Sequence, residues 1–359
     1  MRTSDRKIDH IRICLEEEVE SEYTGFDDIM LIHKALPEID FSEVRTEVEF
    51  FGKKLSAPIL IASMTGGHPE TKEINMKLAM AVEEMGIGMG VGSQRAGIED
   101  ESVADTFAVA REFAPKAFIY ANVGLPQVLK HGVEFVERAV EMVDADAVAI
   151  HLNYLQEAIQ PEGDLNAKGG LGVIEEVCSS INVPVIVKET GAGISREIAI
   201  MLKSAGVDAV DVGGRGGTSW SGVEVYRAEG VTRDVGIDFW DWGIPTAFCV
   251  AECYDVMPII ATGGIRSGLD LAKAIAIGAE IGSSALPFLR AVVERGVEGV
   301  KELVEYYVRG LKTAMFLTGC RRIEDLRKIP IFVTGILKDW LEIRGYDVRK
   351  FCLSREVRR

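Results

Sequence analysis

The sequence predicts an α/β protein, a (β/α)8 barrel with an N-terminal arm and a C-terminal helical extension. Short apolar runs recur along the chain, an amphipathic helical segment follows each run, and each run ends in glycine or a polar residue. The chain has 359 residues, and barrels of this kind reach such a length as one domain. An open, doubly wound sheet is the competing architecture, but eight regular units without a second domain favour closure.

The predicted strands are nearly continuous in hydrophobic residues, as is typical of parallel strands covered on both faces. They span 58–64, 88–93, 117–123, 147–153, 184–189, 209–213, 258–263 and 280–285. The predicted helices span 72–85, 103–113, 126–143, 172–180, 195–205, 245–254, 267–277 and 291–317. Ser195 and Ser267 are expected to cap two helices, and Gly206 and Gly278 to end them.

Three parts follow from this pattern: an arm at 1–50, the barrel at 51–320 and an extension at 321–359. Longer connections, at 154–170 and 218–243, follow the fourth and sixth strands. Both emerge at the carboxyl ends of the strands, where barrels of this kind place their sites. We therefore expect them to be lids or binding loops, with disordered insertions as the alternative.

Composition excludes several classes of function. There are 56 acidic and 40 basic residues, a net charge of −16, which argues against sequence-independent binding of nucleic acid. The N-terminus lacks an apolar signal segment, and Lys273 and Glu280 interrupt the most apolar stretch, so no membrane span is expected. Six sparse cysteines predict buried thiols in a reduced, cytoplasmic protein: Cys14, Cys178, Cys249, Cys253, Cys320 and Cys352.

A phosphate site is predicted where the seventh and eighth strands end. Gly263 and Gly264 precede a helix that begins near Ser267, and the eighth strand ends at 284–286. In such barrels these two loops bind phosphate through free backbone N–H groups and the helix dipole. The alternative is that the glycines only permit a tight turn. The glycine-rich loop 213–218 is either a similar loop or a flexible linker.

Lys188 ends an apolar strand, so its ammonium should point into the mouth of the barrel. A buried lysine needs an anionic partner, and we favour a negatively charged cofactor over Schiff-base chemistry. His151 and Asn153 lie two residues apart and share a face of the fourth strand. Glu157, in the next loop, is either a Mg²⁺ ligand acting through substrate phosphates or a solvated carboxylate.

A basic cluster near the N-terminus is either a solvated tail or an anion clamp that folds over the barrel mouth. The clamp would be completed by two arginines at strand ends. The cations concerned are Arg6, Lys7, His10, Arg12, Arg95 and Arg266.

These motifs, taken together and in this order, resemble the type 2, FMN-dependent isopentenyl-diphosphate isomerases. The matching stretches run from residue 6 to about residue 286 and lie at 6–11, 64–67, 92–95, 151–153, 156–163, 188–193, 213–218 and 263–268. One departure is Tyr154, where many members have a proline.

The resemblance implies an isomerase of isoprenoid biosynthesis that interconverts isopentenyl and dimethylallyl diphosphate. It implies reduced FMN, Mg²⁺ bound by Glu157, and NADPH as the reductant. It also implies a homo-oligomer, a tetramer or an octamer. FMN would be held by Ala62, Ser63, Met64, Thr65, Gly66, Ser93, Asn122, Lys188, Thr218, Gly264, Ile265, Arg266, Ala285 and Leu286. The substrate would contact Arg6, Lys7, Ser93, Gln94, Arg95, His151, Asn153 and Gln156. The expected catalytic residues are Gln156, His151 and Lys188.

The isomerisation adds a proton at one carbon and removes one from another, and an electron-rich reduced flavin stabilises the positive charge that develops. An FMN-dependent TIM-barrel oxidoreductase similar to the 2-hydroxy-acid oxidases is the first alternative. Those enzymes carry a histidine base after the sixth strand, whereas 213–220 here contains none. The second alternative is a non-catalytic module that binds FMN or phosphate.

Overall fold

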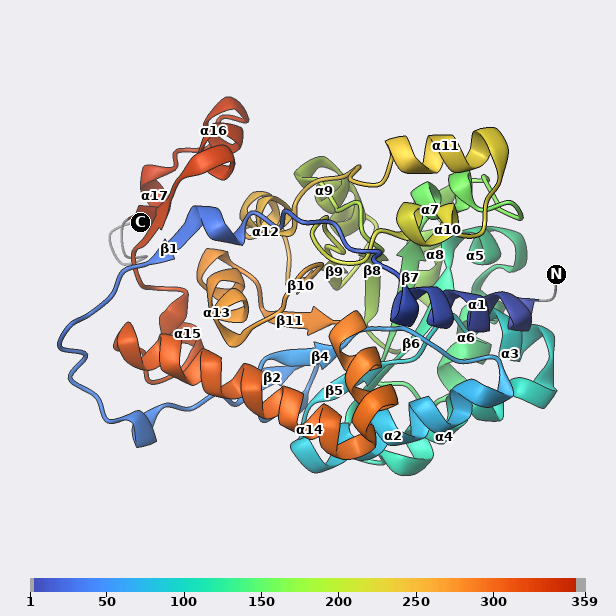
Figure 1. The fold of residues 1–359 in the computed structure, drawn as a ribbon, viewed down its shortest axis with the longest axis horizontal. Helices are drawn as coiled ribbons and strands as arrows, with labels where there is room; N and C mark the ends of the chain where they lie inside the picture. The colour runs from blue at the N-terminus through green and yellow to red at the C-terminus, as the bar shows by residue number, and fades with distance from the viewer. Residues whose placement is uncertain (1–2, 353–359) are drawn as a thin grey trace.

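The computed structural model describes residues 3–352, with side chains for 6–351. Eight parallel strands close into a barrel, as predicted, and helices surround it (Figure 1). The strands are β4 (Ile59–Ile61), β5 (Gly88–Gly90), β6 (Phe118–Gly124), β7 (Ala147–Leu152), β8 (Val185–Glu189), β9 (Ala209–Asp211), β10 (Ile259–Thr262) and β11 (Ile281–Ser284). Pairing of β11 with β4 completes the closure, because Ser283 and Leu60 are register partners.

The outer helices follow the strands in the predicted order. They are α2 (Pro69–Met85), α4 (Asp105–Phe113), α5 (Leu125–His131), α6 (Val133–Met142), α8 (Gly170–Ser180), α9 (Arg196–Ser204), α12 (Thr246–Cys253), α13 (Gly268–Ile277) and α14 (Leu286–Leu317). The helix expected at 126–143 is two helices, because Gly132 adopts a φ of 70° between α5 and α6. The last helix begins at Leu286, five residues earlier than predicted, and bends at Gly296, whose φ is 60°. Ser195 and Ser267 cap their helices as expected.

Both long connections are ordered. The first contains α7 (Tyr154–Ile159), and the second contains α10 (Trp220–Val225) and α11 (Gly230–Asp238). Shorter elements are η1 (Phe26–Asp28), η2 (Phe41–Glu43), η3 (Glu101–Val103), α3 (Arg95–Glu99), α15 (Ile323–Leu326) and α17 (Arg349–Cys352). Of the cysteines, Cys14, Cys249, Cys253 and Cys320 are buried free thiols, and Cys178 is half-buried. The side chain of Cys352 lies outside the described residues.

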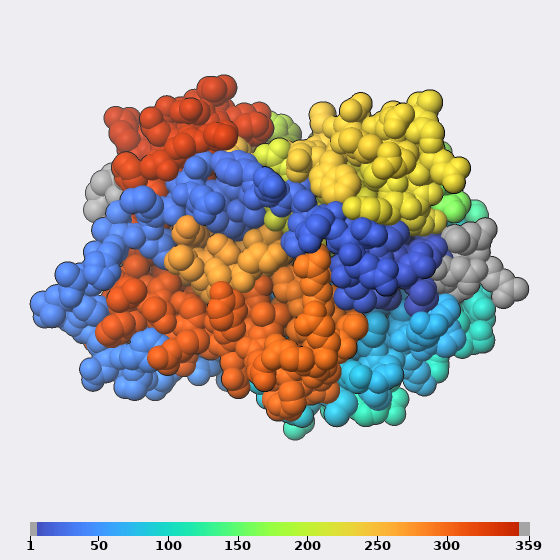
Figure 2. Space-filling view, viewed as in Figure 1, coloured from blue at the N-terminus to red at the C-terminus, as the bar shows by residue number. Residues whose placement is uncertain are grey.

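The arm closes the barrel at one end and covers it at the other. A hairpin of β2 (Val48–Phe50) and β3 (Lys53–Leu55) puts Phe50 and Leu55 into the apolar cluster inside the barrel. The boundary expected between residues 50 and 51 therefore falls within this hairpin. Helix α1 (Thr3–Glu16) lies against α10 and α14 on the molecular surface (Figure 2).

The arm and the C-terminal extension are joined, which the sequence pattern did not indicate. Strand β1 (Ile29–Leu31) pairs antiparallel with β12 (Ile331–Val333). The Asp28 carboxylate accepts a hydrogen bond from the backbone of Leu337 (2.9 Å) at the start of α16 (Gly335–Ile343). Buried Glu252 of α12 accepts hydrogen bonds from Trp340 Nε1 (2.8 Å) and Arg344 Nε (2.7 Å). The extension is thus fastened to both the arm and the barrel.

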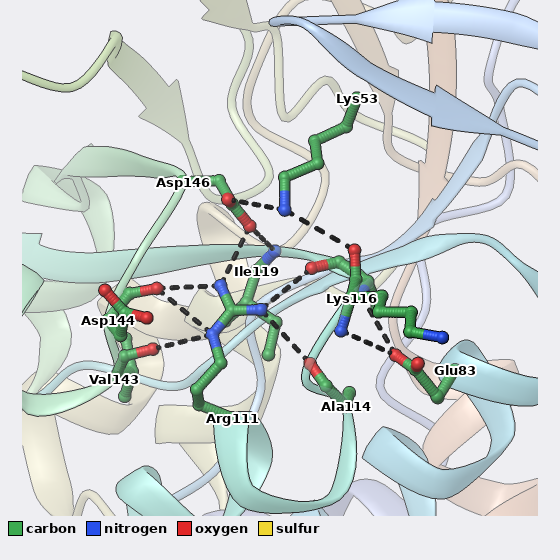
Figure 3. Close-up of polar contacts among 10 residues, drawn as sticks. Lys53, Glu83, Arg111, Ala114, Lys116, Ile119, Val143, Asp144 and Asp146 are labelled. Carbon is green, nitrogen blue, oxygen red and sulfur yellow. Dashed lines mark hydrogen bonds and ion pairs between the residues drawn. The ribbon is translucent and has the colours of Figure 1, made fainter.

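A cluster around Arg111 holds together the amino ends of neighbouring strands (Figure 3). Its guanidinium donates hydrogen bonds to the backbone carbonyls of Ala114 (3.1 Å), Ala117 (3.0 Å) and Asp144 (2.7 Å), and to Asp146 Oδ2 (2.8 Å). This cluster lies at the end of the barrel opposite to the predicted site. Its role is therefore in stability.

Replacing Arg111 with Met should lower the free energy of unfolding by about 2–4 kcal/mol, because a half-buried carboxylate and several carbonyls lose their donor. Denaturant unfolding monitored by circular dichroism measures this loss. Lys130→Met, on the exposed end of α5, is the control and should leave the midpoint unchanged. Equal midpoints for the two variants would contradict the assigned role.

Candidate active site

One large cavity opens at the carboxyl ends of the barrel strands. It encloses about 1580 Å³ of space, part of it open to solvent, and α1, α7 and α10 border it together with the strand ends. Most predicted site residues line this cavity. They are Arg6, Lys7, Ala62, Ser63, Met64, Thr65, Ser93, Arg95, Asn122, His151, Asn153, Gln156, Glu157, Lys188, Thr218, Gly264, Arg266, Ala285 and Leu286.

Three predicted residues do not line the cavity. Gln94 is fully buried behind it, where its Nε2 donates to the carbonyl of Ala139 (2.8 Å) and its Oε1 accepts from Asn122 N (2.9 Å). Gln94 therefore positions the backbone of Asn122, and its expected contact with the substrate stays a prediction. The other two are Gly66 and Ile265. Gly66 packs against the ring of Phe107, and the Ile265 carbonyl accepts from Ser284 Oγ (3.0 Å).

The glycine-rich loops after β9 and β10 pack backbone to backbone. A Cβ added to Gly264, whose φ is 74°, would lie 2.1 Å from the carbonyl oxygen of Gly216. A Cβ on Gly263 would lie at the same distance from the carbonyl oxygen of Gly214. Part of the glycine pattern thus serves the close approach of the two loops. The same approach places both loops on the cavity wall, next to Ala285 at the start of α14.

His151 is held as a neutral acceptor on the cavity wall. Its Nδ1 lies 2.9 Å from Asn122 Oδ1, so Nδ1 carries the proton and Nε2 is left as an acceptor. Burial, followed by the positive charges of Lys188 and Lys7, lowers the pKa of His151 to about 3. The imidazole therefore stays uncharged at neutral pH.

Helix α1 brings two half-buried cations to the cavity. Lys7 Nζ donates to the carbonyl of Ser93 (2.5 Å) and lies 5.2 Å from the centre of the Phe107 ring. Burial, followed by the neighbouring charge of Arg6, lowers the pKa of Lys7 to about 7. Burial also lowers the pKa of Arg6, whereas the negative charges of Glu157 and Glu224 act to raise it. An anion in the cavity would relieve this accumulation of positive charge.

The two strand-end arginines each have a carboxylate partner, as do His10 and Arg12 of the arm. Arg95 Nε donates to Glu99 (2.8 Å), and Arg266 pairs with Glu20 of the arm. Of the cations in the predicted clamp, Arg12 does not line the cavity, whereas the other five do. The binding of an anion by these residues stays a prediction.

Glu224, which sequence analysis did not single out, lies behind the cavity wall and contacts the lining residue Gln156. It is completely buried on α10 and accepts from His10 Nε2 (2.8 Å), Gln156 Nε2 (3.0 Å) and Arg227 Nη1 (2.5 Å). The network joins the arm to both connections that follow the fourth and sixth strands. In the sequence, Glu224 resembles any acid with an arginine three residues later, so no local signal marks it.

Glu157 lies at the mouth of the cavity with its carboxylate already oriented. Its Oε1 accepts from Asn153 Nδ2 (2.9 Å) and its Oε2 from the backbone of Asp164 (2.7 Å). In the part of the chain that the structure describes, no group of three or more His, Cys, Asp or Glu could hold a metal ion. A cation at Glu157 would need further oxygen ligands from a bound molecule.

The cavity floor and wall fit a flavin mononucleotide. Thr65 Oγ1 is buried on the wall without a hydrogen-bond partner, although a buried hydroxyl normally has one. Lys188 is 6% exposed, and its Nζ donates to the carbonyl of Glu189 (2.9 Å), with its charge at the floor. The loops after β10 and β11 supply backbone N–H groups for a phosphate. FMN needs hydrogen-bond donors for its ring and its phosphate. The Thr65 hydroxyl, the Lys188 ammonium and the backbone N–H groups of these loops are suitable donors.

These features define a flavin-binding barrel, and comparison with known proteins agrees. Residues 9–141 and 163–331 match the FMN-dependent dehydrogenase family. Solved structures with the same fold include a lactate oxidase from Pediococcus acidilactici (TM-score 0.64, 18% identity, 89% of each chain covered). A mandelate oxidase variant is also similar (TM-score 0.63, 21% identity, 93% of this chain and 100% of that chain). At these identities the likeness shows the fold alone.

Full-length relatives define the family more narrowly. The isopentenyl-diphosphate delta-isomerase of Archaeoglobus fulgidus is 71% identical over 96% of this chain and 100% of its own length. The enzyme of the same name from Methanosarcina mazei is 54% identical over 98% of each chain. The chain belongs to the isopentenyl-diphosphate delta-isomerase family. Within the described residues, no helix has both the length and the apolar character needed to cross a membrane.

Lys7 should make anion binding dependent on pH. Since its pKa is near 7, the ammonium is mostly protonated at pH 6 and mostly neutral at pH 8.5. Affinity for inorganic pyrophosphate, measured by titration calorimetry, should rise on the order of ten-fold as the pH falls over this range. Pyrophosphate itself gains protons there, so Lys7→Met provides the baseline. Parallel pH profiles for the two proteins would contradict the prediction.

Proposed function

We propose that this protein interconverts isopentenyl diphosphate and dimethylallyl diphosphate with reduced FMN and Mg²⁺. The observation that carries the proposal is the meeting of two anion-binding regions in one cavity: the arm cations Arg6 and Lys7, and the floor formed by Lys188 and the glycine loops. The first region suits a substrate diphosphate and the second a phosphorylated flavin. The names of the full-length relatives support the same reaction.

FMN would be held by the strand ends that line the inner part of the cavity. Lys188 would lie beside the part of the flavin ring that becomes negatively charged on reduction, and Thr65 and Ser93 would supply polar contacts. The backbone at Gly264 and Ala285 would hold the phosphate. When bound, reduced FMN supplies an electron-rich ring that stabilises positive charge on an alkene carbon and a nitrogen that can carry a proton.

The substrate diphosphate would lie beneath α1. Arg6 and Lys7 would bind its oxygens, and Glu157 would reach it through Mg²⁺, which commonly bridges a carboxylate and phosphates. Arg95 borders the same space, but its charge is shared with Glu99. Anchoring the diphosphate fixes the position of a small apolar group that offers few other contacts.

Proton handling would fall to the network at Glu224. Gln156 lines the cavity and donates to Glu224, which also binds His10. Gln156 has no titratable group, so it can orient a proton carrier, whereas Glu224 can accept a proton. The ring of His10 also packs edge-on against Trp220 at 5.2 Å, and this contact between α1 and α10 helps to exclude water. His151, being neutral, would serve as an acceptor beside the flavin.

We further propose that NADPH reduces the flavin, that the protein acts in the cytoplasm, and that it assembles as a tetramer or an octamer. An FMN oxidoreductase of the 2-hydroxy-acid oxidase type is the second candidate, favoured by the likeness of fold to lactate and mandelate oxidases. The loop from Gly213 to Trp220 provides no histidine base for that chemistry.

The deciding experiment begins with the absorption spectrum of the purified protein, which should show bound flavin. The protein is then incubated without oxygen with reduced FMN, Mg²⁺ and isopentenyl diphosphate. We expect dimethylallyl diphosphate to form with no net consumption of reductant. Steady consumption of reductant or oxygen with lactate or mandelate, and no isomer, would favour the oxidoreductase.

Glu157→Gln should raise the Mg²⁺ concentration needed for half-maximal turnover by about ten-fold or more, because one anionic ligand is lost. The flavin spectrum should not change, since Glu157 lies at the mouth. Glu162→Gln, which alters a carboxylate on the same connection that pairs with Arg227, is the control and should keep the wild-type Mg²⁺ dependence. An unchanged Mg²⁺ titration in Glu157→Gln would show that the metal binds elsewhere.

A further inference from the structure

Two residues of opposite charge lie on neighbouring strands inside the barrel, at the base of the cavity. Ile186 on β8 and Ala209 on β9 belong to the apolar cluster inside the barrel. Lys188 and Asp211 come two residues later on the same strands, so their side chains also face the interior. They are register partners across the β8–β9 pair, which places them side by side.

Asp211 lies deeper than Lys188. Lys188 lines the cavity, whereas Asp211 is 1% exposed and is not part of the cavity lining. Among the described residues no hydrogen bond joins the two side chains, and their attraction acts through space. Asp211 can therefore affect a molecule in the cavity only through the lysine or through its electric field.

The side chain of Thr262 on β10 also acts on the Asp211 carboxylate, and a further contact of Asp211 holds the turn that follows β9. Its Oδ1 accepts a hydrogen bond from Gly213 N (3.1 Å), and Gly213 has a φ of 44°. Burial raises the pKa of Asp211, and the Lys188 ammonium acts in the opposite sense. Tyr120, which is also buried in the interior, feels the negative charge of Asp211. A buried acid beside a buried lysine is favoured as an ion pair, because each charge offsets the cost of burying the other.

We propose that Asp211 is a positioning residue that acts as the fixed counter-charge of Lys188. It places a compensating negative charge beside the ammonium at the cavity floor and limits the positive charge that the floor presents to the cofactor. The proposal rests on the proposed function in requiring FMN in this cavity. According to this proposal, the charge of Asp211 sets how much more tightly the cavity binds reduced FMN, which is more negative, than oxidised FMN.

Asp211→Asn tests the charge alone. Asparagine keeps the oxygen that accepts from Gly213 N and removes the negative charge, so Lys188 is left uncompensated. The dissociation constants of oxidised FMN and of reduced FMN are measured with apoprotein in the absence of oxygen. We expect the preference for reduced over oxidised FMN to rise about ten-fold, which for a two-electron couple is a shift of about 30 mV to more positive potential.

Two controls separate charge from structure. Asp211→Ala also removes the acceptor for Gly213 N and should weaken the binding of both forms of FMN. Asp208→Asn alters an exposed acid just before the same strand, whose Oδ2 accepts from Val185 N (2.8 Å) at the opposite end of the barrel. This second control should leave the preference between the two forms unchanged.

Removal of the lysine charge provides the second test, which remains open even if Asp211→Asn alone does not fold. Lys188→Met leaves Asp211 uncompensated and should reduce the preference for reduced FMN at least ten-fold. In the double variant, Lys188→Met with Asp211→Asn, neither charge remains, and the preference should return to within about three-fold of wild type.

An unchanged preference in Asp211→Asn, or a double variant that behaves like Lys188→Met, would overturn the inference while the proposed function stands. Wild-type protein that binds neither form of FMN would overturn the proposed function and this inference with it.

Discussion

The structure depends on the burial of positive charge at one end of an otherwise acidic molecule. Lys7, Arg6 and Lys188 all lie in or against the cavity, and burial lowers the pKa of the first two. Cations in such surroundings are costly unless an anion balances them. Within the chain the balance comes from acids held in place: Glu224 near the arm and, as we propose, Asp211 beneath the floor. The positive charge that these acids do not balance would be balanced by bound anions. The fold is in this way suited to the binding of phosphorylated molecules.

The arm is part of the barrel in a physical sense, although it precedes the barrel in the chain. Its first helix covers the cavity, and its middle part crosses the glycine loops. Its last part forms the hairpin that closes the barrel at the end opposite to the cavity. Ser21 N donates to the carbonyl of Gly217 (2.8 Å), and Thr24 packs against Gly216 and Gly264. The C-terminal extension then fastens the arm through β1 and β12. The glycine-rich loops, the N-terminal arm and the C-terminal extension thus form one connected unit.

The Glu224 network shows how two long connections acquire a shared role. The hydrogen-bond network is made of residues from different helices. Gln156 on α7 and Glu224 on α10 meet beneath His10 of α1. Each partner removes a hydrogen-bonding demand that would otherwise be left buried. The arrangement requires α1 to be in place, because His10 on that helix supplies one of the hydrogen bonds to Glu224.

The order of strands and helices, the glycine loops and most of the residues that line the cavity could be predicted from local sequence patterns. These are local features: near-continuous apolar runs, caps such as Ser267, and strand-end residues such as Lys188 can each be recognised within a few residues. Two features depend on tertiary packing: Gln94 turns away from the cavity to hold Asn122, and Glu224 contacts the cavity residue Gln156. His10 and Glu224 are 214 residues apart, and their contact depends on how α1 packs on α10. Side-chain direction at such positions is set by packing between distant segments, which local sequence patterns do not encode.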